Sequence, residues 1–183
     1  MVWMCLTLLY GVLKGVREIV KKKALEKNST IEVLFLYTLL AFLFVLPDAG
    51  HATGLAPKYY FYIGIKSFVI FLAWMFSFKA IKHMPISLYG VLDLSRVLFA
   101  TLLGVIVLRE QLGGWQLAGI TFVSLGLLLL KYHPGMLFHK TVAKSGQVDV
   151  KIIVMAFSSC LFNAISGLLD KILMKDISSS QLQ

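Results

Sequence analysis

The residues of this sequence that could carry chemistry are charged side chains set within long apolar stretches. There are six of them: Lys14, Arg17, Glu18, Lys66, Asp93 and Arg96. A charge at the middle of a bilayer costs at least ~2.5–3.5 kcal/mol on insertion scales, so such side chains are expected to face a polar cavity or a partner. The chemistry that they indicate is the binding and passage of a polar solute through the bilayer.

The first apolar stretch carries most of these charges on one helical face. Four of them are spaced at i, i+3, i+4 and i+7, which places them side by side on an α-helix: Lys14, Arg17, Glu18 and Lys21. We expect the first three to line a cavity, and Lys21 and Lys22 to lie at the membrane interface. The alternative is that the run from Arg17 onward is interfacial, with long side chains that extend to the headgroups.

Asp93 and Arg96 lie one helical turn apart, deep within an apolar run. We expect them to pair with each other inside that helix, while their depth favours a role in function. Lys66 lies at a similar depth. The six charges together are four positive and two negative, and this surplus of two positive charges predicts an anionic solute because a charged cavity focuses potential on its ligand.

Aromatic and small residues in the apolar stretches have two interpretations each. Four aromatic residues could stack on an organic solute, although packing and interface anchoring are the commoner uses: Tyr10, Phe71, Trp74 and Tyr89. Three glycines are interpreted as positions of close helix packing: Gly104, Gly119 and Gly126.

Composition sets the class of protein. Of the 183 residues, 58% are hydrophobic and 15% are charged, and the mean hydropathy is +0.83. The sequence therefore predicts an all-α polytopic membrane bundle of about six transmembrane helices, with the lipid bilayer as its principal partner. The net charge of +9 is explained by basic loops near anionic headgroups, so no nucleic-acid partner is expected. Cys5 and Cys160 fall in predicted spans and are expected to be buried.

Six apolar stretches approach the ~20 residues that an α-helix needs to cross the bilayer. Their approximate bounds are Trp3–Leu25, Ser29–Pro47, Tyr59–Phe78, Ile86–Leu108, Leu112–Leu130 and Ile152–Leu169. Ser29 and Glu32 form a capping box at the second start. Ala49–Lys58 is predicted to be a loop, Lys79–Met84 a turn, and residues 132–151 a connector.

The beginning of the chain matches its end at a shift of about 149 residues. The matched pairs are Lys14 with Asn163, Arg17 with Ser166, Lys22 with Lys171, Ser29 with Ser178 and Glu32 with Gln181. Polar residues on the first helix of each copy are expected if both line one central cavity, so Asn163 and Ser166 join the candidates. Repeats of five helices are inverted relative to each other, as in many secondary transporters. Chance similarity between two apolar helices is the alternative.

The segment 81–130 resembles the EamA-type domain of the drug/metabolite transporter superfamily. The resemblance rests on a serine after a short turn, a helix that ends in a glycine-containing apolar run, a Glu-x-Leu motif and a Gly-x6-Gly pair: Ser87, Gly104, Glu110-Gln111-Leu112 and Gly119…Gly126. Arg96 stands where the family often has a helix-bending proline. The resemblance implies ten helices as two inverted five-helix repeats, with residues 1–131 as the first repeat and 152–183 as an incomplete second, so a truncated form is expected.

The function that follows is transport. We expect a secondary transporter, or permease, of the plasma membrane that moves a small metabolite or drug-like solute by alternating access. The alternative is a non-transporting membrane subunit or remnant that works only in a homodimer or with a partner chain. No enzyme, cofactor or metal site is expected, because the four histidines are expected in loops without partners at metal-ligand spacing and no phosphate-binding loop is present. Orientation stays open, since the bias of basic residues favours an outside N-terminus and the resemblance implies a cytoplasmic one.

Overall fold

The apolar stretches of the sequence form helices throughout the part of the chain that the structure, a computed structural model, describes: residues 2–47, 56–132 and 149–178. The helices are α1 (Val2–Lys27), α2 (Thr30–Val45), α3 (Pro57–His83), α4 (Ile86–Asp93), α5 (Ser95–Leu108), α6 (Gly114–Tyr132) and α8 (Val150–Leu173). No strand occurs in these ranges, which confirms the predicted all-α class.

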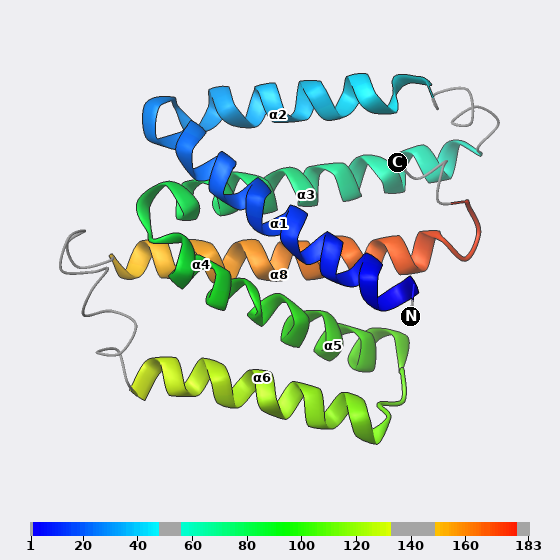
Figure 1. The fold of residues 1–183 in the computed structure, drawn as a ribbon. Coiled ribbons are helices and arrows are strands. Elements are labelled where there is room, and N and C mark those ends of the chain that lie inside the picture. Colours follow the sequence, from blue (N-terminus) through cyan, green and yellow to red (C-terminus); the bar gives the residue numbers. More distant parts are fainter. Residues whose placement is uncertain (1, 48–55, 133–148, 179–183) are drawn as a thin grey trace.

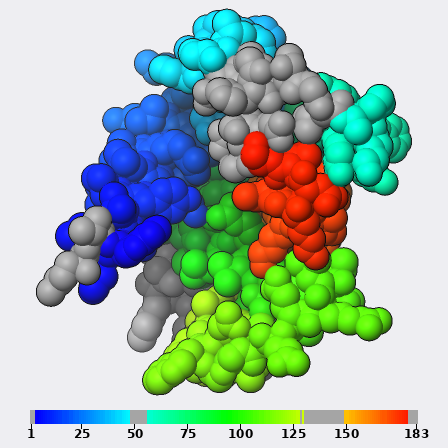
Figure 2. All heavy atoms as spheres, turned by 90° about the vertical axis from the view of Figure 1, so that its right-hand side faces the viewer, coloured from blue at the N-terminus to red at the C-terminus, as the bar shows by residue number. Residues whose placement is uncertain are grey.

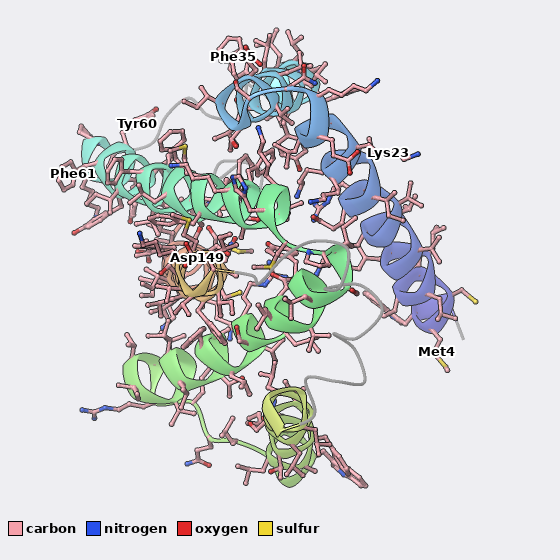
Figure 3. All side chains as sticks on the ribbon, turned by 90° about the vertical axis from the view of Figure 1, so that its left-hand side faces the viewer. Met4, Lys23, Phe35, Tyr60, Phe61 and Asp149 are labelled. Carbon is pink, nitrogen blue, oxygen red and sulfur yellow. The ribbon has the colours of Figure 1, made fainter. Side chains whose placement is uncertain are left out.

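The helices are those of a membrane bundle. Within the described residues, three helical segments are long and apolar enough to cross a bilayer: α3, α4 together with α5, and α8. Two shorter apolar helices are α2 and Gly114–Leu127 of α6. Large apolar side chains cover the outside, including Trp3 at 82% exposure and Phe44 at 84%, and Met4, Phe35 and Phe61 project from the bundle (Figure 3). Such a surface suits lipid rather than water. The predicted membrane bundle is confirmed.

α8 lies at the centre of the bundle. It packs along α3 and α5 and touches α4 (Figure 1). It begins at Val150, inside the predicted connector, and its N-cap Asp149 accepts a hydrogen bond from the Lys151 amide at 3.1 Å. α1 runs in the opposite direction to α8 (Figure 1). Most of the other predicted loop, Ala49–Lys58, and most of the connector lie outside the described residues. The end of that loop is wrong, because Ala56 is the N-cap of α3 and the helix begins at Pro57, a residue that suits the first turn of a helix.

α3 is longer than its apolar run because its end is fastened to α1. The predicted turn Lys79–Met84 is wrong: the helix continues to His83 and ends at Met84, whose extended backbone is the conformation favoured before a proline. Lys22 Nζ donates hydrogen bonds to the carbonyl oxygens of Ile81, Lys82 and Met84 at 2.8, 2.8 and 3.2 Å. These bonds satisfy carbonyls that the end of a helix leaves free. Lys22 therefore links α1 to the end of α3. Its predicted position at the membrane interface stays a prediction.

The predicted helix Ile86–Leu108 is interrupted at Leu94, where α4 ends and α5 begins. The Leu94 amide bonds to the Val91 carbonyl, and the Val97 amide bonds to the Leu94 carbonyl, so the helix tightens locally to i→i−3 bonding. The carbonyl oxygen of Leu92 instead accepts the Ser95 hydroxyl at 2.7 Å and the Cys160 thiol of α8 at 3.6 Å. The helix is therefore interrupted at Leu94 by these hydrogen bonds and without a proline.

The capping box predicted at the start of α2 is present. The Glu32 amide donates to Ser29 Oγ at 3.2 Å, and the Ser29 amide donates to Glu32 Oε2 at 2.9 Å. The repeat shift predicts a copy of this capping box at Ser178 and Gln181. Gln181 lies outside the described residues.

The cap gives a first prediction about stability. Ser29→Ala removes the hydroxyl acceptor and should lower the free energy of unfolding by about 1 kcal/mol. Thr30→Ala is the matched control, because Thr30 occupies the next position without a side-chain hydrogen bond among the described residues. Unfolding by sodium dodecyl sulfate in mixed micelles measures both variants, and equal losses would contradict the role of the cap.

Candidate functional site

A polar cavity of about 150 Å³ lies inside the bundle, between α1 and the helices α2, α3, α4, α5 and α8. Seen from the end at which α8 finishes, the molecule is hollowed between α1 and α8 (Figure 2). We call this polar cavity the charged cavity. Its lining consists of Tyr10, Lys14, Arg17, Glu18, Lys21, Tyr37, Trp74, Ser77, Phe78, Tyr89, Asp93, Arg96 and Asn163. This volume is enough for several ordered water molecules, or for a small organic ion in their place.

The longest-range ion pair in the cavity joins α1 to α4. Lys14 Nζ donates to Asp93 Oδ2 at 3.1 Å, and the two side chains are 32% and 17% exposed. The predicted pair between Asp93 and Arg96 is wrong, because the interruption at Leu94 falls between these residues and ends the regular helix that would have stacked them. Arg96 has no ion pair or hydrogen bond within the described part of the chain.

A second cluster of charges surrounds Glu18 on α1. Its carboxylate accepts hydrogen bonds from Arg17 Nη2 at 2.9 Å and from Lys21 Nζ at 3.0 Å. Lys21, which was predicted to lie at the membrane interface, instead lines the charged cavity. Its side chain is only 10% exposed, and its ammonium lies 4.9 Å from the centre of the Phe78 ring. An ammonium over a ring face is attracted by the ring's quadrupole.

Aromatic rings form the wall opposite α1. The ring of Tyr37 meets those of Trp74 and Phe78 edge-on, with centroids 5.4 and 5.9 Å apart. The Tyr89 hydroxyl and Ser77 Oγ lie 2.7 Å apart and share a buried hydrogen bond. Rings of this kind provide apolar contact area with few rotatable bonds. The cavity thus offers an organic solute both charged partners and flat apolar surface.

The charges that line the cavity do not balance. Four are positive and two are negative, which leaves a surplus of two positive charges: Lys14, Arg17, Lys21 and Arg96 against Glu18 and Asp93. The size of the surplus equals that predicted from the sequence, but Lys21 takes the place of Lys66. Within a low-dielectric bundle such a surplus attracts anions.

A comparison with protein families decides what kind of protein this is. The model of the EamA-like transporter family matches residues 1–132. The chain belongs to the EamA-like transporter family. Searches of curated proteins and of solved structures give no match. The charged cavity therefore lies within a membrane transporter-type domain, contributed mainly by the helices of the matched region and by Asn163 of α8.

Three candidates of this EamA-like protein lie away from the charged cavity: Lys66, Phe71 and Ser166. Phe71 is 46% exposed. Lys66 Nζ lies 2.6 Å from Asp170 Oδ1 on α8, an ion pair that the sequence analysis did not foresee. A signal for it existed, because the repeat shift places Lys21, a charged residue of α1, on Asp170. Ser166 is 2% exposed and buried in the bundle. The other predicted repeat partner, Asn163, does reach the cavity.

The glycines and cysteines differ in part from their predictions. A Cβ on Gly104 would stand 2.8 Å from Glu110 Oε2, which is a close contact, whereas at Gly119 and Gly126 no atom lies within 4 Å. Close packing at the last two is therefore not found among the described residues. Cys160 is buried as predicted, but Cys5 is exposed on the outside of the bundle.

Sequence reasoning missed the contributions of Lys21, Tyr37, Ser77 and Phe78 to the cavity. No group of three metal-ligating residues occurs in the described ranges. His83 closes the last turn of α3 instead of lying in a loop, and the other three histidines lie outside the described residues.

The ion pair between α1 and α4 gives a second prediction. Lys14→Met and Asp93→Asn should each lower the free energy of unfolding by about 1–3 kcal/mol, because each leaves a half-buried polar partner unpaired. The double variant should be more stable than the sum of the two losses predicts, by about 1 kcal/mol.

Unfolding titrations in mixed micelles provide the measurement. Lys23→Met is the matched control, since Lys23 lies on the same helix and points away from the bundle (Figure 3). Additive losses in the double variant would show that the two side chains do not interact.

Proposed function

We propose that this EamA-like protein is a secondary transporter that moves a small organic anion across the plasma membrane. The observation that carries the proposal is the charged cavity, in which side chains from six helices converge inside an apolar bundle with a surplus of two positive charges. Charged residues within a bilayer are costly and are retained where they serve a solute or ion pathway. Membership of a transporter family points to the same class of function.

The recognition chemistry follows from the lining of the cavity. Lys14 and Arg96 supply cationic groups for a carboxylate or a similar anion, and the Tyr37, Trp74 and Phe78 rings supply apolar area for its carbon skeleton. Asp93 holds Lys14 when no solute is bound. Because Asp93 neutralises that ammonium, the energetic cost of the unloaded site stays low. A bound anion would compete with Asp93 for the ammonium.

The mechanism we propose is alternating access between two inverted five-helix repeats. The repeat shift aligns α1 with α8, and the two helices run in opposite directions on either side of the hollow (Figures 1 and 2). Both bring polar residues to the same cavity, Lys14 from α1 and its counterpart Asn163 from α8. Rocking of one repeat against the other about such a midplane site is a common transporter design. The working form would include a further chain or a second copy where a single chain does not suffice.

Counterflow into proteoliposomes tests this function directly, because it needs no ion gradient. We expect labelled small aromatic carboxylates to enter vesicles preloaded with the same unlabelled compound, while the matching amines do not. Lys14→Gln should lower the initial rate about tenfold or more, since a charge-assisted hydrogen bond is worth ~1.5–3 kcal/mol.

Lys23→Gln is the control for this experiment and should keep the wild-type rate, because Lys23 lies outside the cavity. Exchange of amines but not of carboxylates would overturn the anion proposal. Absence of any exchange, with a folded protein and with no gain on adding a second chain, would favour the alternative of a non-transporting subunit.

A further inference from the structure

A second and larger hollow opens beside the charged cavity, between α5, α6 and α8. It is a groove of about 970 Å³, lined mainly by apolar and small residues such as Thr101, Ile120, Val123 and Leu168. Its volume is near the upper end of the range of small-molecule sites.

Arg96 and Asn163 line both the groove and the charged cavity, and they are the only residues common to both linings among the described residues. Arg96 is half-buried and has no ionic partner in the described ranges. It lies twelve residues before the end of α5 at Leu108, which is about 18 Å along a helix axis. An unpaired guanidinium so far from the helix end needs an anion, because an isolated charge in a low dielectric is unfavourable.

The other end of the groove is bridged by an ion pair. Lys171 Nζ of α8 lies 3.1 Å from Glu110 Oε1, which belongs to the turn after α5. Arg109 gives this turn its shape by adopting a left-handed conformation with φ of 53°, and the Glu110 amide then bonds to the Gly104 carbonyl at 3.2 Å. The carboxylate folds against Gly104, where a Cβ would collide with it. The Glu-x-Leu motif and Gly104 thus act together to hold α8 at this end.

We infer that the groove is the route by which an organic anion with an apolar body reaches the charged cavity, with Arg96 as the recognition residue at the inner end and the Glu110–Lys171 pair closing the outer end. Charge complementarity selects this occupant: the lining carries Arg96 and Lys171 against Glu110, a surplus of one positive charge, and the remainder is largely apolar. The inference deepens the proposed function and rests on it.

Thiol reactivity at Thr101, a groove residue of α5, tests the route. Thr101→Cys is placed in a Cys5→Ser, Cys160→Ala background of the full chain in lipid nanodiscs. The rate of each reagent at this position is divided by its rate with a free thiol in solution. On this relative scale we expect the anionic 2-sulfonatoethyl methanethiosulfonate to react about tenfold faster than the cationic trimethylammonioethyl reagent, because a cationic groove concentrates anions. Benzoate should slow the reaction and benzylamine should not.

Variants of the recognition residue separate charge from folding. Arg96→Gln should abolish the preference for the anionic reagent, and Arg96→Lys should preserve it. Ile106→Cys is the control position, because it is 71% exposed on α5 and does not line the groove. Equal relative rates of the two reagents at Thr101→Cys, or an unchanged preference in Arg96→Gln, would overturn the inference.

The outer ion pair is tested with the uncharged methyl methanethiosulfonate. Glu110→Gln and Lys171→Gln change the charge of the groove in opposite directions, but both remove the bridge, so both should raise the rate at Thr101→Cys about two- to fivefold, as expected from an exposed pair. Opposite effects or no effect would show that the pair does not close the groove.

The counterflow experiment distinguishes the two failures. Anion preference at Thr101→Cys without any carboxylate exchange would leave the groove as an anion site and reject the transport function. Carboxylate exchange that depends on Lys14, without anion preference at Thr101→Cys, would reject the route and leave the proposed function standing.

Discussion

The ion pair between Lys14 and Asp93 is the interaction on which the rest of the arrangement depends. α1 carries four charges in its middle, which is more than a lipid-exposed helix can carry cheaply. The pair, at 3.1 Å, and the bonds of Glu18 to Arg17 and Lys21 turn those charges toward α4 and the aromatic wall. The opposite face of α1 is left apolar, with Leu8 and Leu9 exposed. A helix that could not stand alone in a bilayer is thereby made the wall of a polar cavity.

The interruption at Leu94 gives the two charges of the fourth span different tasks. In an uninterrupted helix, residues 93 and 96 would lie on neighbouring positions of one face and neutralise each other. Because the helix tightens at Leu94, Asp93 bonds to α1 while Arg96 lines the boundary between the charged cavity and the groove. A short stretch of i→i−3 bonding within a long helix is a common feature of hinges, and here it separates the charge that stabilises the fold from the charge that is free to bind.

Local patterns predicted the class, the capping box and most of the charged cavity, because apolar length and helical spacing are properties of the chain itself. The pairings were not predictable in this way. Whether Lys21 or Lys66 joins the cavity depends on how α3 and α8 pack, and Lys66 is diverted to Asp170 only by that packing. The end of α3 was misplaced for the same reason, since its last turn is held by Lys22 from another helix. Long-range contacts set these details, and their signal in one sequence is faint.

Lys22 and Lys171 are matched by the repeat shift, and each lies near the C-terminal end of its helix, α1 or α8. These two helix ends lie at opposite ends of the bundle (Figure 1), and the two lysines hold them with different strength. Lys22 donates to three backbone carbonyls in a partly buried position, whereas Lys171 pairs with one carboxylate and both partners are exposed, at 61% and 45%. Exposed pairs contribute little because water screens them. In the alternating access that we propose, one end opens while the other stays closed. We therefore expect the end at Glu110 to open at lower cost, and this is the outer end of the groove, with Arg96 at its inner end.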